Sequence, residues 1–587
     1  MVISFVKFNA LFINFNNYKK DNMKVSEIPY HRYDVNIIIN LFFAAEKELK
    51  TAKSGEEVKK IREKVVEEEV ALDTAFNLAF IRWSINTADE FYVAEKEYYD
   101  QNLPKTYKSK SAYRKAFLSA AEKFGGDYPP SLLSVIKYKL ISENEKIESE
   151  AAAENALVSE YSDFMSALTV DYNGESLPVT IIKGYMSDGD RAIREKAHNA
   201  LGAALKTNAE FLDDNFDALV KNRDKQAKIL GFKNYAELSY YRMNRTSYKE
   251  AELNSLKNSV KKYIVPALTR LRGEIAEKLG IETLKIYDLS AVTRSLPPKP
   301  VASGAALLEN GRKMYREMSD DTGKFFDFML NNDAFDVLSK KNKWGGGYET
   351  DIAGYNQPFI LANFNGTSAD ADVLTHEAGH AYASYKMSES RKDKELGLPF
   401  MDVAETHSMS MEFFCYKYIT ELFGKESEKY KFSHLIDSFT FIPYGVMVDE
   451  FQKIVYETPN LTPSERKAAW LKLEKEYRPF FSNDGVTYFE DGGRWQYQMH
   501  VYESPFYYID YVIAGLTAMQ FLILSLENYD AAFEKYREFI SLGADEGYLN
   551  LIEKSGLKSP FIEETIKEIT EKISAVIDDF INRGACE

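Results

Sequence analysis

Residues 371–380 read ADVLTHEAGH, with His376 and His380 four positions apart and Glu377 directly after the first histidine. In a helix, residues four apart lie on one face, so both imidazoles can reach one metal ion. Glu377 then lies beside that ion as general base to a zinc-bound water, the arrangement of an H-E-x-x-H motif. The alternative is an exposed helix with incidental histidines. Gly379 costs ~1 kcal/mol relative to alanine in mid-helix, which indicates close packing by another segment.

A catalytic zinc site needs a third protein ligand. Ala383 and Lys386 stand where a metzincin would need glycine and histidine, so that class is excluded. Downstream, the apolar spacing of residues 399–423 predicts a helix. Its candidate side chains are Glu405, His407 and Glu412. Glu405 and Glu412 are seven apart and share a face, so either can be the ligand while the other accepts a hydrogen bond from a ligating imidazole.

A second group of polar side chains lies in HVYESPFYYIDY, residues 500–511. Its candidates are His500, Tyr507, Tyr508 and Tyr511. A tyrosine hydroxyl or an imidazole N–H aimed at the substrate carbonyl would stabilise the oxyanion formed during peptide hydrolysis. The alternative is aromatic packing, which is common in a chain with 39 tyrosines. His407 is expected to point away from the ligand face, and His31, His198 and His434 are expected to have no role.

The rest of the chain predicts a mainly helical protein, because apolar residues recur at intervals of three and four. Residues 170–190 alternate around Asn173 and Gly174, which predicts a short hairpin. Residues 342–373 lack helical periodicity and predict a small sheet leading into the HEAGH helix. The apolar stretch 511–526 is shorter than the ~20 residues of a membrane span and predicts a buried helix.

Composition narrows the class of protein further. The formal net charge is −16 and the sequence pI is about 5.2. A nucleic-acid partner would need a basic face and an anionic membrane would repel this charge, so we expect neither partner. Only two cysteines are present, Cys415 and Cys586. They exclude a disulfide framework and a thiolate metal site, and they fit a reducing, cytoplasmic location. Residues 1–22 lack the features of a secretory signal and are expected to form an extension or disordered arm.

Three segments, taken in order, resemble the oligoendopeptidase F branch of the thimet-oligopeptidase-like zinc peptidases. They are KQAKILGFKNYAELSYYRM (225–243), PFILANFNGTSADADVLTHEAGHAYASY (358–385) and GRWQYQMHVYESPFYYIDYVIAGLTA (493–518). Between the last two, ETHSMSME carries Glu405, Ser408 and Glu412 at the positions of an E-x-x-S-x-x-x-E segment whose first glutamate is the ligand in that group. Asp510 departs from the resemblance, which predicts a basic or neutral residue there.

The resemblance implies a mainly α, two-lobed helical metallopeptidase with a deep substrate channel and a small β-sheet beside the H-E-x-x-H helix. Residues 23–185 would form an N-terminal helical region and 186–587 the zinc peptidase catalytic domain. His376, His380 and Glu405 would bind one Zn²⁺ per chain, and Glu412 would hold a ligating imidazole. The strand-like segment before the motif would pair with the substrate backbone as an added edge strand. Its expected substrate-binding residues are Phe359, Leu361, Asn363, Asn365 and Gly366.

The expected activity is therefore a zinc-dependent endopeptidase that hydrolyses internal bonds of short, unstructured oligopeptides. Glu377 would be the base, and His500 with one or more of Tyr507, Tyr508 and Tyr511 would hold the carbonyl oxygen. One alternative is a peptide-binding relative that has lost catalysis, which the presence of every ligand and of the base disfavours. The other is a zinc exopeptidase, for which no motif that captures a free terminus is found.

Overall fold

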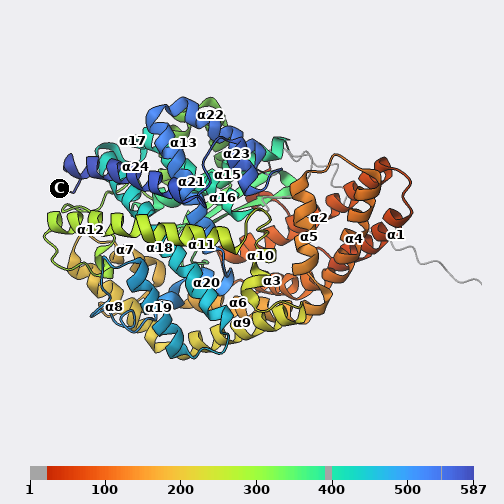
Figure 1. The fold of residues 1–587 in the computed structure, drawn as a ribbon, viewed down its shortest axis with the longest axis horizontal. Helices are drawn as coiled ribbons and strands as arrows, with labels where there is room; N and C mark the ends of the chain where they lie inside the picture. Colours follow the sequence, from red (N-terminus) through yellow and green to blue (C-terminus); the bar gives the residue numbers. More distant parts are fainter. Residues whose placement is uncertain (1–22, 391–399, 544, 587) are drawn as a thin grey trace, which may run out of the picture.

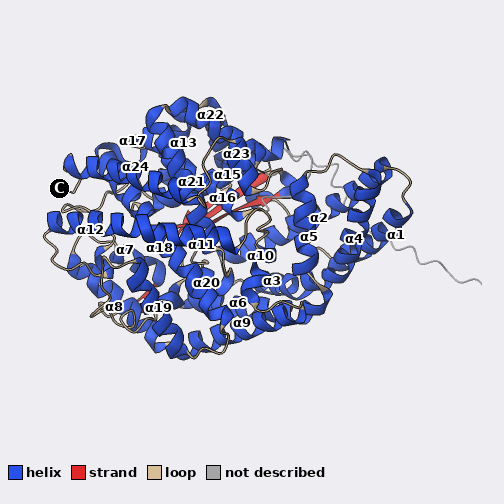
Figure 2. Ribbon diagram, in the orientation of Figure 1, coloured by secondary structure: helices blue, strands red, loops and turns tan. Residues whose placement is uncertain are grey.

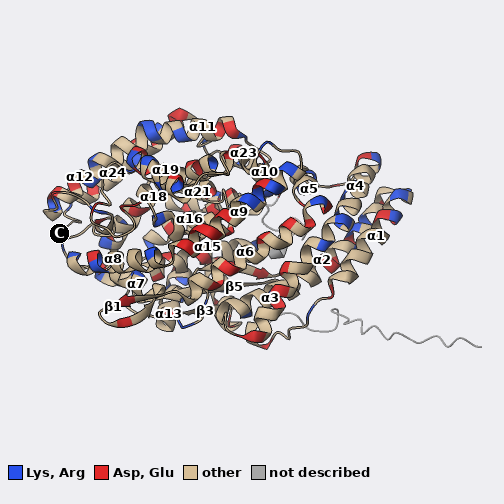
Figure 3. Cartoon of the chain, turned by 90° about the horizontal axis from the view of Figure 1, so that it is seen from below, with Lys and Arg blue, Asp and Glu red and all other residues tan. Residues whose placement is uncertain are grey.

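The computed structural model describes residues 23–390, 400–543 and 545–586. The described chain is built largely of helices and contains two small β-sheets (Figures 1 and 2). This confirms the mainly α fold that the sequence predicts. Acidic and basic residues are interspersed along the outer helices (Figure 3). The segment 1–22, expected to be an extension or disordered arm, lies outside the described residues.

The N-terminal helices pack around a hydrophobic cluster of their own, at the red and orange end of Figure 1. The side chain of Asp34 accepts a hydrogen bond from the N–H of Asn36 and so caps the first helix. Apolar residues recur along this helix every three or four positions and face α2 and α4. These helices are α1 (Val35–Thr51), α2 (Gly55–Ile85), α3 (Glu90–Asn102), α4 (Tyr107–Phe124) and α5 (Pro130–Ser142).

The remaining helices surround a second, larger hydrophobic cluster. Among them, α16 packs against α15 and α21, and α21 packs against α18; these helices carry most of the predicted site. The helices are α6 (Glu148–Ala167), α7 (Val179–Met186), α8 (Arg191–Thr207), α9 (Ala209–Ile229), α10 (Tyr235–Arg242), α11 (Glu250–Ser259), α12 (Val265–Leu279), α13 (Ala305–Met318), α14 (Asp320–Asn331), α15 (Ala369–Ser390), α16 (Met401–Phe414), α17 (Thr420–Phe423), α18 (Ser427–Glu457), α19 (Pro463–Tyr477), α20 (Met499–Glu503), α21 (Tyr508–Glu527), α22 (Tyr529–Leu542), α23 (Tyr548–Lys554) and α24 (Glu563–Asn582).

The predicted hairpin is confirmed. Strands β1 (Thr169–Tyr172) and β2 (Glu175–Pro178) pair in antiparallel fashion across a two-residue turn. Asn173 and Gly174 have φ values of 56° and 84°. Positive φ at both central residues is what a type I′ turn requires, and Asn-Gly is the dipeptide that adopts it most readily.

The predicted small sheet before the H-E-x-x-H helix is also confirmed. It consists of β3 (Phe335–Leu338), β4 (Tyr348–Ile352) and β5 (Gln357–Phe364), in the order β3-β5-β4. Strand β5 pairs in parallel with β3, where Asp336 faces Leu361, and in antiparallel fashion with β4, where Thr350 faces Phe359. The strand that leads into α15 is therefore the central strand of the sheet.

This position contradicts the prediction that the segment is an edge strand available to substrate. Phe359 and Leu361 are buried among the other strands and helices. The side-chain amide of Asn363 donates hydrogen bonds to the carbonyls of Trp344 and Gly346, both at 2.8 Å. The side-chain amide nitrogen of Asn363 and the hydrogen-bonding edges of the strand are thus engaged within the protein.

The backbone N–H groups of the turn that follows β5 are likewise hydrogen-bonded within the protein. The backbone N–H groups of Asn365 and Gly366 each donate to the carboxylate of Asp370 at 2.8 Å. Gly366 adopts a φ of 85°, which a side chain would oppose. These two N–H groups are therefore engaged within the protein, while the assignment of Asn365 and Gly366 to substrate binding stays a prediction.

The apolar stretch 511–526 lies in α21, which confirms the predicted buried helix. It is long and apolar enough to cross a membrane by length and composition, yet 72% of its most apolar window is buried inside the protein. Both cysteines, Cys415 and Cys586, are buried, and no disulfide joins them.

Candidate metal centre and active site

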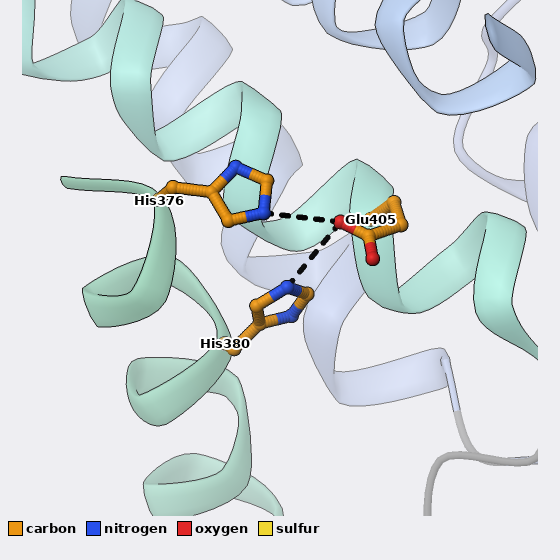
Figure 4. Close-up of side chains that lie close together, drawn as sticks. All are labelled: His376, His380 and Glu405. Carbon is orange, nitrogen blue, oxygen red and sulfur yellow. Dashed lines mark ion pairs between the residues drawn. The ribbon is translucent and has the colours of Figure 1, made fainter. Parts of the chain in front are cut away.

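The two histidines of the motif project from one face of α15, one turn apart, toward α16 (Figure 4). His376 Nε2 lies 3.2 Å from Glu405 Oε2, and His380 Nε2 lies 3.3 Å from the same oxygen. One ligand atom from each of the three residues lies within 4.8 Å of the other two. Spacing alone left Glu405 and Glu412 open as the third ligand, and the structure brings Glu405 to the two Nε2 atoms.

Helix α16 approaches α15 closely because Gly379 has no side chain. A Cβ atom at Gly379 would lie 2.6 Å from the Cα of Ser408 and 2.9 Å from the carbonyl oxygen of His407. Glu405 stands one turn before these atoms on the same helix. The glycine inside the motif therefore sets the distance between the helix that carries the histidines and the helix that carries the glutamate.

This group of side chains fits a zinc ion. Zinc bonds of about 2.0–2.2 Å to nitrogen and oxygen in a tetrahedron place ligand atoms roughly 3.3 Å apart, close to the two distances found here. Two imidazoles and a carboxylate are also the ligand types that zinc prefers. Although burial lowers the pKa of His376, hydrogen bonds to Glu405 and Glu412 raise it well above 6.5. The site is thus strongly attractive to positive charge, which a divalent cation supplies.

Glu412 accepts a hydrogen bond from the other nitrogen of His376, the role that the family resemblance implies for it. The distance from Glu412 Oε1 to His376 Nδ1 is 2.6 Å. The second carboxylate oxygen lies 2.7 Å from His434 Nε2, and His434 Nδ1 lies 2.6 Å from the hydroxyl of Tyr416. This chain of hydrogen bonds fixes Nε2 of His376 as the nitrogen that faces the metal position.

His434 has a role that the sequence did not indicate. It stands on α18, 22 residues after Glu412, and no helical spacing relates the two positions. The orientation of His407 follows the prediction, since its ring is buried against Phe539 of α22 rather than facing the metal position.

Glu377 lies beside the same centre with 7% of its surface exposed, and burial raises the pKa of its carboxyl group. A raised pKa brings a carboxylate closer to the value that suits a general base at neutral pH. Its Oε1 is 3.5 Å from the position that a Cβ would take on Gly347, directly before β4. The Gly-rich segment before β4 therefore borders the base, and a side chain at Gly347 would crowd it.

His500, on α20, is held as a neutral donor. Burial lowers its pKa to about 4. The side-chain amide nitrogen of Gln498 lies 3.4 Å from His500 Nδ1, and the amide oxygen accepts from the hydroxyl of Tyr444 at 2.8 Å. Because an amide N–H faces Nδ1, that nitrogen is an acceptor and the proton resides on Nε2. His500 Nε2 lies 3.3 Å from the hydroxyl of Tyr511.

The three tyrosines are not equivalent. The Tyr507 hydroxyl donates to Glu405 Oε1, the oxygen that does not face the two histidines. Tyr511 meets His500 through its hydroxyl, and its ring lies edge-on to that of Tyr507. Tyr508 packs instead against Phe441 and other aromatic rings. The structure therefore directs two of the three predicted hydroxyls, those of Tyr507 and Tyr511, toward the groups around the metal position.

Asp510, which departs from the resemblance, faces away from this centre. It is buried at 3.2 Å from the guanidinium of Arg245, and the hydroxyl of Tyr248 lies 3.3 Å from it. Arg245 also donates to the carbonyl oxygen of Phe506. The carboxylate thus anchors the tyrosine segment to the chain between α10 and α11, and an acidic residue here is compatible with the site.

Two family profiles match this chain. The Peptidase M3 N-terminal domain matches residues 25–140, and Peptidase family M3 matches residues 184–306 and 314–571.

Solved structures and a curated relative agree with the profiles. PZ peptidase A in complex with an inhibitor is similar, with a TM-score of 0.91 and 36% identity, over 95% of this chain and 99% of that one. A Bacillus anthracis protein described as a candidate oligoendopeptidase F is similar, with a TM-score of 0.87 and 35% identity, over the same shares. An oligoendopeptidase F homolog of Mycoplasma genitalium is 24% identical over 315 residues, 50% of each chain, so the match spans about half the length of that curated relative. The chain belongs to peptidase family M3.

Proposed function

We propose that this family M3 peptidase is a zinc-dependent endopeptidase that cleaves internal bonds of short, unstructured oligopeptides. One observation carries the proposal: Glu405 meets Nε2 of both His376 and His380, with Glu377 beside them. Three protein ligands and one open position are the composition of a catalytic zinc site, whereas structural sites use four. When bound there, zinc supplies Lewis-acid chemistry, polarising the substrate carbonyl and lowering the pKa of water.

The side chains of the protein then carry the proton transfers and hold the substrate. Glu377 accepts a proton from the attacking water and delivers it to the leaving amine. The Nε2–H of His500 and the hydroxyl of Tyr511 donate hydrogen bonds to the carbonyl oxygen as negative charge develops on it. Tyr507 holds the free oxygen of Glu405, and Glu412 holds His376, so both ligands keep their orientation through the reaction.

A preference for short peptides fits the burial of the site. The side chain of His376 is 21% exposed and that of His380 is 13% exposed, so the reacting bond has to reach the protein interior. An extended, unstructured segment can do this, whereas a bond within a folded domain cannot leave its own surface.

The proposal is tested with an internally quenched peptide that is blocked at both ends. We expect the zinc-loaded protein to cleave it, because an endopeptidase needs no free terminus. Glu377→Gln should retain zinc and lose cleavage, since the amide keeps the shape of the side chain but cannot accept the proton. Cleavage of unblocked peptides alone would indicate an exopeptidase. Full activity of Glu377→Gln would remove Glu377 as the base.

A further inference from the structure

A recess of about 270 Å³ lies next to the metal centre, between α15, α16, α18 and α21. Three of its lining residues stand on helices that also carry residues of the metal site. Asp372 stands one helical turn before His376 on α15, and Met409 stands between the two glutamates of α16. Tyr511 contributes another wall while its hydroxyl contacts His500. The recess therefore borders the place where the cleaved bond would lie.

The far wall of the recess is acidic. Asp437 of α18 keeps 53% of its side chain exposed, although burial raises the pKa of its carboxyl group. The carboxylate therefore lines the recess and remains open to solvent. Its Oδ1 is 3.0 Å from Arg272, whose side chain is 2% exposed behind it. Asp372 supplies a second carboxylate, which accepts from the hydroxyl of Tyr430 at 2.6 Å.

Neither lysine nor arginine is among the described residues that line the recess. His434 is among its lining residues, but both ring nitrogens are engaged, by Glu412 and by Tyr416. Burial lowers the pKa of His434, but the hydrogen bond to Glu412 raises it above 6.5 overall, so the ring carries a positive charge that Glu412 offsets. The three carboxylates of Asp372, Asp437 and Glu412 outnumber the two cationic groups, Arg272 and His434, so the groups around the recess have a net negative charge.

From this position, shape and charge we infer that the recess is a specificity pocket for a cationic side chain, lysine or arginine, of a substrate residue next to the cleaved bond. The inference rests on the proposed endopeptidase function. Met409, Phe441 and Tyr511 offer apolar surface to the methylene stem, and Asp372 and Asp437 offer oxygens to the charged head. The volume is below the about 300–1,000 Å³ of pockets that hold whole ligands, so one side chain suits it.

The test compares blocked, internally quenched peptides that differ at one position at a time on either side of the cleaved bond. Each position carries lysine, arginine, methionine or glutamate, and mass spectrometry of the products confirms that the cleaved bond stays the same. We expect kcat/KM at one of the two positions to be at least about tenfold higher for lysine or arginine than for methionine. Glutamate should be the poorest of the four, because like charges repel.

Two variants test whether Asp437 and Asp372 cause the preference for a cationic side chain. Asp437→Asn retains an acceptor for Arg272, and Asp372→Asn retains an acceptor for Tyr430, so each removes charge with little change of shape. Each should lower the lysine-to-methionine ratio of kcat/KM at least about fivefold. Asp530→Asn is the matched control, because Asp530 lies on α22 with a side chain that is 91% exposed and the change in net charge is the same. It should leave the ratio unchanged.

Equal kcat/KM for lysine and methionine at both positions would overturn the inference. So would a ratio that is unchanged in Asp437→Asn and Asp372→Asn, provided that circular dichroism shows both variants folded. If one variant does not fold, the other still decides. Failure to cleave any peptide would overturn the proposed function, and the inference with it, whereas cleavage without preference overturns the inference alone.

Discussion

Replacement of Gly379 by alanine probes how closely the two ligand-bearing helices must pack. The added Cβ would lie 2.6 Å from the Cα of Ser408. Carbon atoms in contact are about 3.5–4.0 Å apart, so α15 and α16 would have to separate by about 1 Å. Overpacking of this kind costs about 1–3 kcal/mol, and the higher helix propensity of alanine returns at most about 1 kcal/mol.

The separation also acts on the site, because Glu405 lies one turn before Ser408 on α16. A misplacement of about 1 Å in a catalytic arrangement can lower the rate by about 100-fold. We therefore expect Gly379→Ala to unfold at lower urea concentration, to bind zinc more weakly and to lose most of its kcat/KM on a blocked peptide. Urea denaturation, competition with a chelator and steady-state kinetics measure the three effects.

Gly273→Ala is the matched control. Gly273 lies within α12, and no heavy atom apart from the helix's own neighbouring backbone comes within 4 Å of the position of its Cβ. This variant should be as stable as the wild type or more stable by up to about 1 kcal/mol, with unchanged activity. If Gly379→Ala behaves like Gly273→Ala in all three measurements, the argument that the motif glycine sets the helix spacing is refuted.

Three further perturbations follow from the described contacts. Glu412→Gln should weaken zinc binding by about 10- to 100-fold in a chelator competition, since it weakens the bond that orients His376; unchanged affinity would contradict this role. Tyr511→Phe should lower kcat by about 10²- to 10³-fold, as loss of an oxyanion donor does. Tyr508→Phe should keep a kcat close to that of the wild type, because the Tyr508 ring packs against other aromatic rings. Similar losses of kcat in both variants would count against the role of Tyr511. Burial lowers the pKa of His198 from 6.5 to about 4. Below about pH 6.5 the His198 imidazole binds a proton in the unfolded chain, whereas in the folded chain it binds one only near pH 4. As the pH falls through this window, the free energy of unfolding therefore decreases by up to about 3 kcal/mol because of this group. Urea unfolding at about pH 7.5 and pH 5 should show a smaller loss for His198→Gln than for the wild type, and equal losses would refute the assignment.

The sequence predicts the local parts of this structure well. Helical periodicity identifies the mainly α fold, and Asn173-Gly174 identifies the hairpin because its turn depends on two adjacent residues. The H-E-x-x-H motif is local in the same sense, since four residues of helix place His376 and His380 on one face. The glycine within the motif indicates close packing, which the contact with Ser408 bears out.

Features that depend on distant segments are less accessible to sequence analysis. The residues of the strand Gln357–Phe364 do not by themselves show whether it lies at the edge or in the centre of the sheet. Its place depends on its pairing with β3 and β4. His434 reaches Glu412 from another helix, so no spacing rule predicts the contact. Gln498 sits only two residues before His500, yet its amide has to be oriented by Tyr444 before the proton on His500 can be assigned.

The central claim is that one zinc ion held by His376, His380 and Glu405 makes this protein an endopeptidase. The most direct measurement is the rate of cleavage of a doubly blocked peptide as zinc is returned to metal-depleted protein. The account predicts no cleavage without metal, and a rise that is proportional to added zinc and ends at one equivalent per chain. Cleavage that persists undiminished in the metal-depleted protein would contradict it.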